Sequence, residues 1–153
     1  MSDFSVRRAT PADADVIVDC MREAFAPFKD QYTQGAYEDT VPDSINDRLK
    51  TMSVFVAVYN DNIIGTIACA KHEKEGHLRG MAVGAVWRGQ GVAAALLQAA
   101  EDELRKQNCR RVTLDTTEPL ERAMRFYEKH GYRATGGGED FFGMRLREYA
   151  KDL

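Results

Sequence analysis

A short glycine-containing turn constrains this chain more than any other feature. Residues 88–93 read Arg-Gly-Gln-Gly-Val-Ala and stand between a predicted strand and a long predicted helix. Because Gly89 and Gly91 have no Cβ, the backbone can bend sharply there and a ligand can approach the main-chain amides. The first N–H groups of a helix have no intrahelical partner, and the helix dipole is positive at that end. The turn therefore predicts an anion-binding site that suits phosphate oxygens.

Hydrophobic periodicity places this turn in a chain of strands and helices. Strands are expected at residues 4–9, 53–59, 63–71, 77–83, 111–116, 132–135 and 141–146. Helices are expected at residues 11–26, 43–52, 92 to about 108, and 119–130. Residues 28–41 show no period and predict a mobile loop, whereas Asn60, Asp61 and Asn62 predict a hairpin turn. This order of elements predicts an α/β (α+β) fold, a mixed sheet with helices on its faces.

Length and charge bound the class of protein. A chain of 153 residues with 44% hydrophobic residues fits one compact domain, residues 1–153. The formal net charge of −3 gives no field that would attract a polyanion, so general nucleic-acid binding is not expected. The N-terminal residues contain no apolar signal core, and no run approaches the ~18 apolar residues that a membrane span needs. We therefore expect a cytoplasmic protein.

The cysteines and two of the histidines are expected to be structural. Cys20, Cys69 and Cys109 are widely spaced, and no C-x-x-C pair points to zinc or redox chemistry. We interpret them as reduced packing residues. His72 and His130 are expected at a strand end and a helix end. Nothing in the sequence suggests a metal site.

The glycine turn also fits a second kind of cofactor. Gly89-x-Gly91-x-x-Ala94 satisfies the dinucleotide fingerprint, and Asp115 lies roughly where that fingerprint expects a ribose-binding acid. That fingerprint needs its first glycine directly after a parallel strand, but residues 84–88 intervene here. Only 38 residues (153 − 115) follow Asp115, too few to complete a doubly wound fold. A nicotinamide- or flavin-dependent oxidoreductase is therefore the weaker alternative.

Two motifs together resemble one family. Arg88-x-x-Gly91-x-Ala93 resembles the (Gln/Arg)-x-x-Gly-x-(Gly/Ala) signature of the GCN5-related N-acetyltransferase (GNAT) family. About 35 residues further on, Ala123-x-x-Phe126-Tyr127 and the following Gly131-Tyr132 resemble the second motif of that family. The order of elements agrees with the family fold over nearly the whole chain. The resemblance implies a mostly antiparallel central sheet and an N-acetyltransferase that uses acetyl-CoA without a metal.

The resemblance also implies which residues bind acetyl-CoA. Amides of the turn would hold the pyrophosphate, and the backbone of the preceding strand would pair with the pantetheine arm as an added strand does. The residues that inherit these roles are Met81, Ala82, Val83, Arg88, Gly89, Gln90, Gly91, Val92 and Ala93. The family usually has Asn three residues before the Ala123 position, where it contacts the cofactor arm. This chain has Leu120 there, and Thr117 or Asp115 could take over that contact.

The chemistry requires a neutral amine and a proton for the departing thiolate. By the same resemblance, Tyr127 is the candidate general acid that protonates the sulfur of coenzyme A. His77 is the candidate base, because the strand that begins with it resembles that of arylalkylamine N-acetyltransferases, where a histidine relays the amine proton through water. An imidazole with a pKa near ~6.5 suits that task. Direct attack by the amine needs no acyl-enzyme and hence no catalytic triad.

The acceptor is less constrained by the sequence. Residues 28–39 lie where this family builds much of its acceptor pocket, and they contain aromatic and acidic side chains. That combination favours a small-molecule primary amine with apolar or aromatic bulk. Transfer to a protein lysine or N-terminus, and a regulatory module that binds acetyl-CoA without catalysis, are the alternatives. A homodimer through the last strands is expected only by analogy with the fold.

Overall fold

The computed structural model describes residues 3–153, and its strands form one sheet. Met1 and Ser2, part of the N-terminal segment considered above, lie outside this range. The strands are β1 (Ser5–Arg8), β2 (Ser53–Tyr59), β3 (Asn62–His72), β4 (Glu75–Val83), β5 (Arg111–Thr117), β6 (Arg133–Ala134), β7 (Asp140–Phe141) and β8 (Met144–Asp152). Their spatial order is β1-β2-β3-β4-β5-β8-β6, with β7 paired to β8. Only β4 and β5 run parallel among these pairs, which confirms a mixed, mostly antiparallel sheet.

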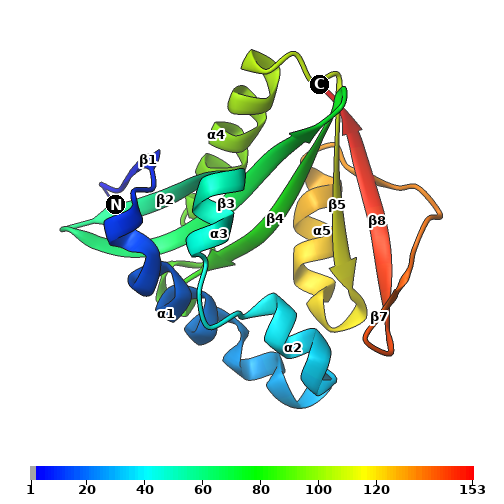
Figure 1. Ribbon diagram of the computed structural model, residues 1–153, viewed down its shortest axis with the longest axis horizontal. Helices are drawn as coiled ribbons and strands as arrows, with labels where there is room; N and C mark the ends of the chain where they lie inside the picture. The colour runs from blue at the N-terminus through cyan, green and yellow to red at the C-terminus, as the bar shows by residue number, and fades with distance from the viewer. Residues whose placement is uncertain (1–2) are drawn as a thin grey trace.

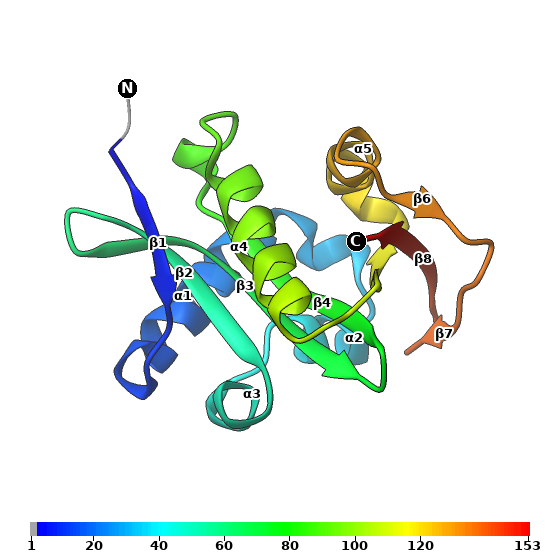
Figure 2. The same ribbon diagram turned by 90° about the horizontal axis from the view of Figure 1, so that it is seen from above.

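Five α-helices and four 3-10 helices connect these strands. The α-helices are α1 (Ala14–Phe25), α2 (Gln34–Thr40), α3 (Asn46–Thr51), α4 (Val92–Lys106) and α5 (Glu121–Lys129) within the described residues. The 3-10 helices are η1 (Pro11–Asp13), η2 (Ala26–Gln31), η3 (Ala85–Trp87) and η4 (Glu118–Leu120). In Figure 2, α4 and α3 lie on opposite sides of the strands.

Two apolar clusters form the core, one on each face of the sheet. Strand alternation separates them, because Val56 of β2 faces the α1 cluster while its neighbour Ala57 faces the α4 cluster. On the α4 side, Leu96 and Leu104 are fully buried. On the α1 side, Met21 is fully buried. The sheet is therefore packed against helices on both faces.

The local signals at the element ends are mostly confirmed. Thr10 and Asp13 form the capping box that begins η1 and α1. Asn60 and Asp61 adopt φ values of 47° and 63° in the hairpin turn, and Gly131 adopts φ 94° after α5. Each of these residue types tolerates the left-handed region, which is why the sequence marked these turns.

Three expectations about elements are wrong. Residues 28–41 are not a mobile loop, because η2 and α2 occupy most of them. The Thr33 hydroxyl caps α2 by accepting from Ala36 N–H at 3.3 Å, and a helix of seven residues is too short to show a hydrophobic period. The second helix begins at Asn46 rather than residue 43. The expected strand at 141–146 contains a turn at Phe142 and Gly143, with φ 52° and 87°, and β8 continues to Asp152.

Candidate functional site

β4 and β5 pair for only part of their length and then separate. Their parallel register runs from Glu75 opposite Arg111 to Leu78 opposite Leu114 and stops there. Beyond it, β4 continues to Val83 and β5 to Thr117, and Figure 1 shows the two strands diverging. The facing main-chain edges of both strands are thus without a strand partner among residues 3–153. An extended ligand could pair with either edge.

A β-bulge in β4 accompanies this separation. The register between β3 and β4 shifts between Thr66 and Ala68, and Gly80 lies opposite the shift with φ 68°. Glycine is favoured there because the left-handed region strains most residues that carry a Cβ. The sequence analysis expected a regular strand over residues 77–83, and the isolated Gly80 is the one signal in it that could have indicated a bulge.

Met81, Ala82 and Val83, the residues predicted to pair with the pantetheine arm, follow Gly80 in β4. Ala82 and Val83 pair with Thr66 and Gly65 of β3, so their β5-facing edge is open. The chain then passes through η3 into the glycine turn. The Trp87 ring packs against Tyr59 with centroids 4.8 Å apart, which fixes the start of the turn.

The turn itself has the predicted backbone. Gly89 and Gly91 have φ 75° and 86°, and a Cβ built on either would meet nothing within 4 Å. The first hydrogen bond of α4 joins Ala95 N–H to Gly91 O at 3.1 Å, and no side chain caps Gly91. The amides of Val92 and Ala93 precede that bond, so they can donate to a ligand. The turn therefore offers a phosphate group free space, N–H donors and the positive end of a helix dipole.

The side chains of Arg88 and Gln90 donate hydrogen bonds to main-chain carbonyls of the protein itself. The Arg88 guanidinium donates to Ala24 O at 3.4 Å, and the Gln90 side-chain amide donates to Val86 O at 2.9 Å. These contacts shape the turn rather than point to a ligand. The nine predicted cofactor residues lie within residues 81–93, at the end of β4, in the turn and at the start of α4.

Thr117 and Asp115, which could replace the missing asparagine, both have partners within the protein, whereas the hydroxyl of Thr116 between them has none among the described residues. The Thr117 hydroxyl is 2.7 Å from the Tyr32 hydroxyl, and Asp115 lies beside His77. Leu120 packs against the α1 cluster. Thr116 is 4% exposed, and its hydroxyl is the one buried side-chain polar atom without a partner among residues 3–153. By alternation it shares the face of Val112 and Leu114, toward α4 and α5.

Tyr127 lies in the core between α5 and the sheet. Its side chain is 6% exposed, and its ring makes edge contacts with Phe126 and Tyr132 at centroid distances of 5.4 and 5.5 Å. Burial raises the pKa of the phenol well above its ordinary value of 10. The hydroxyl therefore keeps its proton at neutral pH, as a general acid must.

His77 is half-buried on the opposite face of the sheet, with its Nδ1 3.0 Å from the Thr113 hydroxyl. That hydroxyl has one hydrogen, which it donates to Gly76 O at 3.4 Å, so it accepts from His77 Nδ1–H. This leaves the lone pair on Nε2, which lies 3.8 Å from an Asp115 carboxylate oxygen. Burial lowers the pKa of His77 below 6.5, although Asp115 opposes that shift. The imidazole is thus neutral at pH 7 and can accept a proton at Nε2.

Two carboxylates accompany this imidazole. Asp115 of β5 stands directly opposite Glu148 of β8 in the antiparallel register. Burial raises the pKa of Asp115 above 3.8, His77 lowers it, and the Glu148 charge raises it further. We call the side of β4, β5 and β8 that carries His77, Asp115 and Glu148 the His77 face. Sequence reasoning did not assign Glu148 to the site, because only the strand register brings it there.

The aromatic residues of the segment 28–39 are partly used for packing. Tyr32 is 9% exposed and hydrogen-bonds Thr117, and its ring makes an edge contact with Tyr37 at 6.4 Å. The segment lies against the end of β5, on the His77 face. The segment therefore borders the site. Its two tyrosine rings pack against each other and do not surround an open pocket.

The three cysteines are buried as expected, and His72 and His130 lie at the predicted strand end and helix end. All three cysteines are free and buried, and burial raises the pKa of the Cys20 and Cys69 thiols to about 11 and about 12. His130 Nδ1 lies 2.8 Å from Phe126 O, where it closes α5. Within residues 3–153 no group of three metal-ligating side chains comes together. None of the described helices is long and apolar enough to cross a bilayer.

Comparison with known proteins identifies the family. The sequence profile of the Acetyltransferase (GNAT) family matches residues 17–132, which is more than half of the chain. This chain therefore belongs to the GNAT acetyltransferase family. The dinucleotide alternative is excluded with it. β4, α4 and β5 do form a parallel unit, but η3 separates the strand from the glycines and the remaining strand pairs are antiparallel.

Curated relatives share only part of their length with this chain. N-alpha-acetyltransferase 30 of Schizosaccharomyces pombe is 37% identical over 83 residues, 51% of this chain and 55% of that protein. N-acetylaspartate synthetase of Rattus norvegicus is 32% identical over 96 residues, 60% of this chain and 32% of that protein. The chain thus spans about half, or less, of these relatives.

Solved structures agree with the fold over the whole chain. The PaiA N-acetyltransferase of Thermoplasma acidophilum, solved in complex with coenzyme A, superposes with a TM-score of 0.83 at 15% identity, covering 99% of both chains. Ard1 of Thermoplasma volcanium superposes with a TM-score of 0.74 at 23% identity, covering 98% of this chain and 97% of that one. At these identities the likeness establishes the fold alone.

Proposed function

We propose that residues 1–153 form one acetyl-CoA-dependent N-acetyltransferase domain, which transfers acetyl to a primary amine of a small molecule by direct attack. The observation that carries this proposal is the glycine turn before α4. The turn has two glycines in the left-handed region and main-chain N–H groups that precede the first hydrogen bond of α4. It follows the part of β4 that separates from β5, and the chain belongs to a family of acetyltransferases. A diphosphate at the turn would direct the thioester arm along that edge.

The main chain supplies most of the proposed cofactor contacts. The amides of Gly89, Gly91, Val92 and Ala93 would hold the pyrophosphate, and the β5-facing edge of residues 81–83 would pair with the pantetheine arm. Acetyl-CoA supplies the acetyl group as a thioester with a good leaving group. Thr116 is the side chain best placed to add a polar contact, because its buried hydroxyl has no other partner within the described residues.

His77 and Tyr127, on opposite faces of the sheet, each carry out one of the two proton transfers. His77 Nε2 accepts a proton from the attacking amine, directly or through water, while Thr113 holds the ring by its other nitrogen. Tyr127 donates its phenolic proton to the departing sulfur as the carbon–sulfur bond breaks. The separation of β4 from β5 is what lets groups on both faces reach one reacting centre.

The acceptor itself is proposed from this chain, not from its relatives. One relative's name refers to N-alpha acetylation and another's to N-acetylaspartate, so the names give no common acceptor. An apolar or aromatic part of the acceptor would lie against the wall formed by Tyr32 and Tyr37.

Two measurements test the proposal together. Acetyl-CoA at 100 times its dissociation constant should stabilise the protein by about 2.7 kcal/mol in thermal melting. Free thiol should then be released when a panel of primary amines is added. Stabilisation without turnover of any amine would favour a non-catalytic binding module, and no stabilisation at all would remove the proposal.

A further inference from the structure

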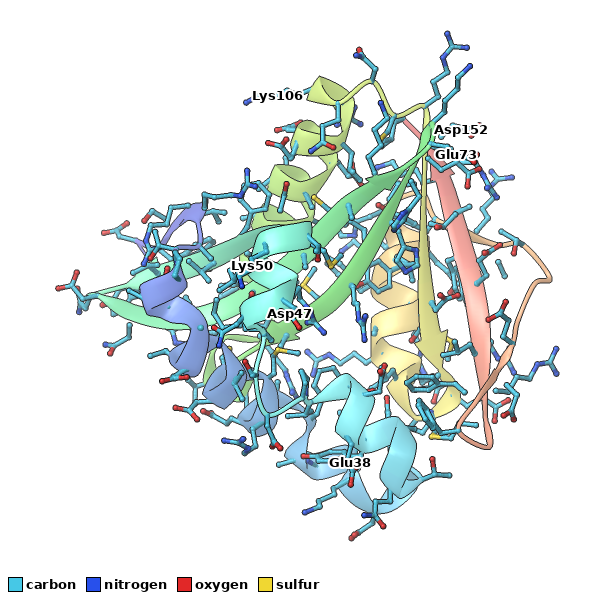
Figure 3. All side chains as sticks on the ribbon, viewed as in Figure 1. Glu38, Asp47, Lys50, Glu73, Lys106 and Asp152 are labelled. Carbon is cyan, nitrogen blue, oxygen red and sulfur yellow. The ribbon has the colours of Figure 1, made fainter. Side chains whose placement is uncertain are left out.

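A cation from α3 lies beside the bulge of β4 on the His77 face. A Cβ built on Gly80 would come within 2.6 Å of Arg48 Nη1, so the guanidinium lies directly against the backbone where β4 bulges away. Figure 3 shows the labelled Asp47 and Lys50 on the same helix, and both are exposed. Arg48, between them in sequence, is instead half-buried.

This guanidinium has no carboxylate partner among residues 3–153. Its one hydrogen bond is from Nη1 to the Met21 sulfur at 4.0 Å, and a thioether is a weak acceptor. A guanidinium has five N–H donors, so most of its capacity is unused. The nearby Asp39 carboxylate pairs with Arg79 at 3.0 Å instead. Two cations therefore share one carboxylate.

The surroundings of Arg48 disfavour its charged form when no ligand is bound. The pKa of Arg48 is lowered to about 10, chiefly by burial and then by the neighbouring Arg79, and Asp39 only partly compensates. A half-buried cation without an anion is costly to the fold, because no ion pair repays its desolvation. It is a good binding element, since an incoming carboxylate would satisfy both the charge and the fork of donors.

The cation pair lies next to the candidate base. Arg79 follows His77 by two residues on β4, so the two side chains leave the same face about 6.6 Å apart along the strand. Their proximity is felt electrostatically, because Arg79 lowers the pKa of His77. Across β4 from the cations, Asp115 and Glu148 carry negative charge. The His77 face is therefore positive toward α3 and negative toward β8.

From this division of charge we propose that the acetyl acceptor is a free aminocarboxylate, whose carboxylate binds Arg48 with help from Arg79. Its ammonium group lies toward His77, Asp115 and Glu148, where it loses a proton before attack. The inference rests on the proposed function and names its substrate class. It excludes the N-terminus of a protein as the preferred acceptor, because the α-carboxyl of that residue is an uncharged amide carbonyl.

The test compares acids with their amides. Acetyl transfer from acetyl-CoA would be measured for L-phenylalanine against L-phenylalaninamide and for L-methionine against L-methioninamide. Because hydrogen bonds to a charged group are worth about 1.5–3 kcal/mol, kcat/KM should be about 10- to 100-fold higher for the acids. Equal or faster transfer to the amides would overturn the inference while leaving the proposed function intact.

Three variants locate the effect. Arg48→Met should remove the preference for acids without lowering Tm, because it replaces an unpaired cation by an apolar chain of similar length. Arg48→Lys keeps the charge but not the fork, and should retain only part of the preference. Lys50→Met removes an exposed cation from the same helix and should change nothing. An acid preference that survives Arg48→Met would contradict the assignment of the carboxylate to Arg48.

Binding keeps the inference testable even without turnover. If no amine is acetylated, the protein saturated with coenzyme A would be titrated with N-acetyl-L-phenylalanine and with its amide. Binding of the acid alone, lost in Arg48→Met, supports the carboxylate site although the proposed function has failed. Absence of acid binding by the unmodified chain overturns it.

Discussion

The glycine turn before α4 and the His77 face are built in different ways. The turn is one continuous segment, and its binding groups are main-chain amides exposed by two left-handed glycines. The His77 face gathers side chains from α3, β4, β5 and β8, which are far apart in the sequence. A site made of backbone leaves a signature in a short motif, whereas a site made of distant side chains leaves none until the strands are in register.

The same contrast separates their chemical roles. The turn has donors and a helix dipole, so it suits a fixed, highly charged group that every reaction cycle shares. The His77 face has charged groups of both signs at positions that single substitutions can change. We therefore expect changes at the turn to alter cofactor binding and changes on the His77 face to alter acceptor turnover.

The largest effect is expected at Tyr127, which lies in the core between α5 and the sheet, on the face opposite His77. Tyr127→Phe removes the proton for the leaving sulfur but keeps the ring that packs against Tyr132. Because a general acid contributes about 10²–10⁴-fold, kcat should fall by that factor. Acetyl-CoA affinity, measured by calorimetry, should be unchanged. Unchanged kcat would show that this phenol only packs the core.

His77 tests the other face through pH. Burial lowers its pKa below 6.5, so the neutral base persists below that pH, and kcat/KM should fall only as pH drops through the lowered pKa. His77→Gln should reduce kcat/KM about 10²-fold and abolish that acidic limb. A pH–rate profile of both proteins checks this. A limb that is unaltered in the variant would assign the titration to another group.

A charge-only pair of variants tests the turn. Asp and Asn both tolerate the left-handed conformation of Gly91 and have the same size. Gly91→Asp places a negative charge beside the expected phosphates, so acetyl-CoA should bind about 10- to 100-fold more weakly than to Gly91→Asn. The stability of Gly91→Asp should be no lower, because an acid at a helix N-terminus is favourable. Equal affinities would place the diphosphate elsewhere.

The smallest effect is expected at Thr116. Thr116→Val keeps the shape of the side chain but removes a buried hydroxyl that has no partner within the described chain. Folding stability should stay equal or rise by up to about 1 kcal/mol, while acetyl-CoA affinity falls about fivefold if the hydroxyl contacts the cofactor arm. Chemical denaturation and calorimetry would measure the two. A fall in stability would instead indicate a structural role for the hydroxyl.

The sequence predicted what short-range rules determine. The mixed sheet, the long helix after the turn and the glycine conformations follow from periodicity and from the φ values that glycine allows. The helices at residues 26–40 did not follow, because they are short and are held by a cap and by tertiary packing. The turn at Phe142 was missed because it requires a non-glycine residue in the left-handed region.

The residues of the candidate site also fall into those that a local motif reveals and those that only the folded structure reveals. Arg88, Gly91 and Tyr127 could be named from motifs, because each belongs to a pattern within one segment. Arg48, Thr116 and Glu148 could not, since their significance depends on a missing partner or on strand register. His77 could be proposed, but the hydroxyl that fixes its tautomer is on another strand.

The central claim is that amides at the start of α4 hold the diphosphate of acetyl-CoA. Titration of ¹⁵N-labelled protein tests it most directly. The amide resonances of Gly89, Gly91, Val92 and Ala93 should shift strongly with acetyl-CoA and much less with acetyl-pantetheine, which lacks the phosphates. If those four resonances stay in place while acetyl-CoA binds and moves others, the account of this site is wrong.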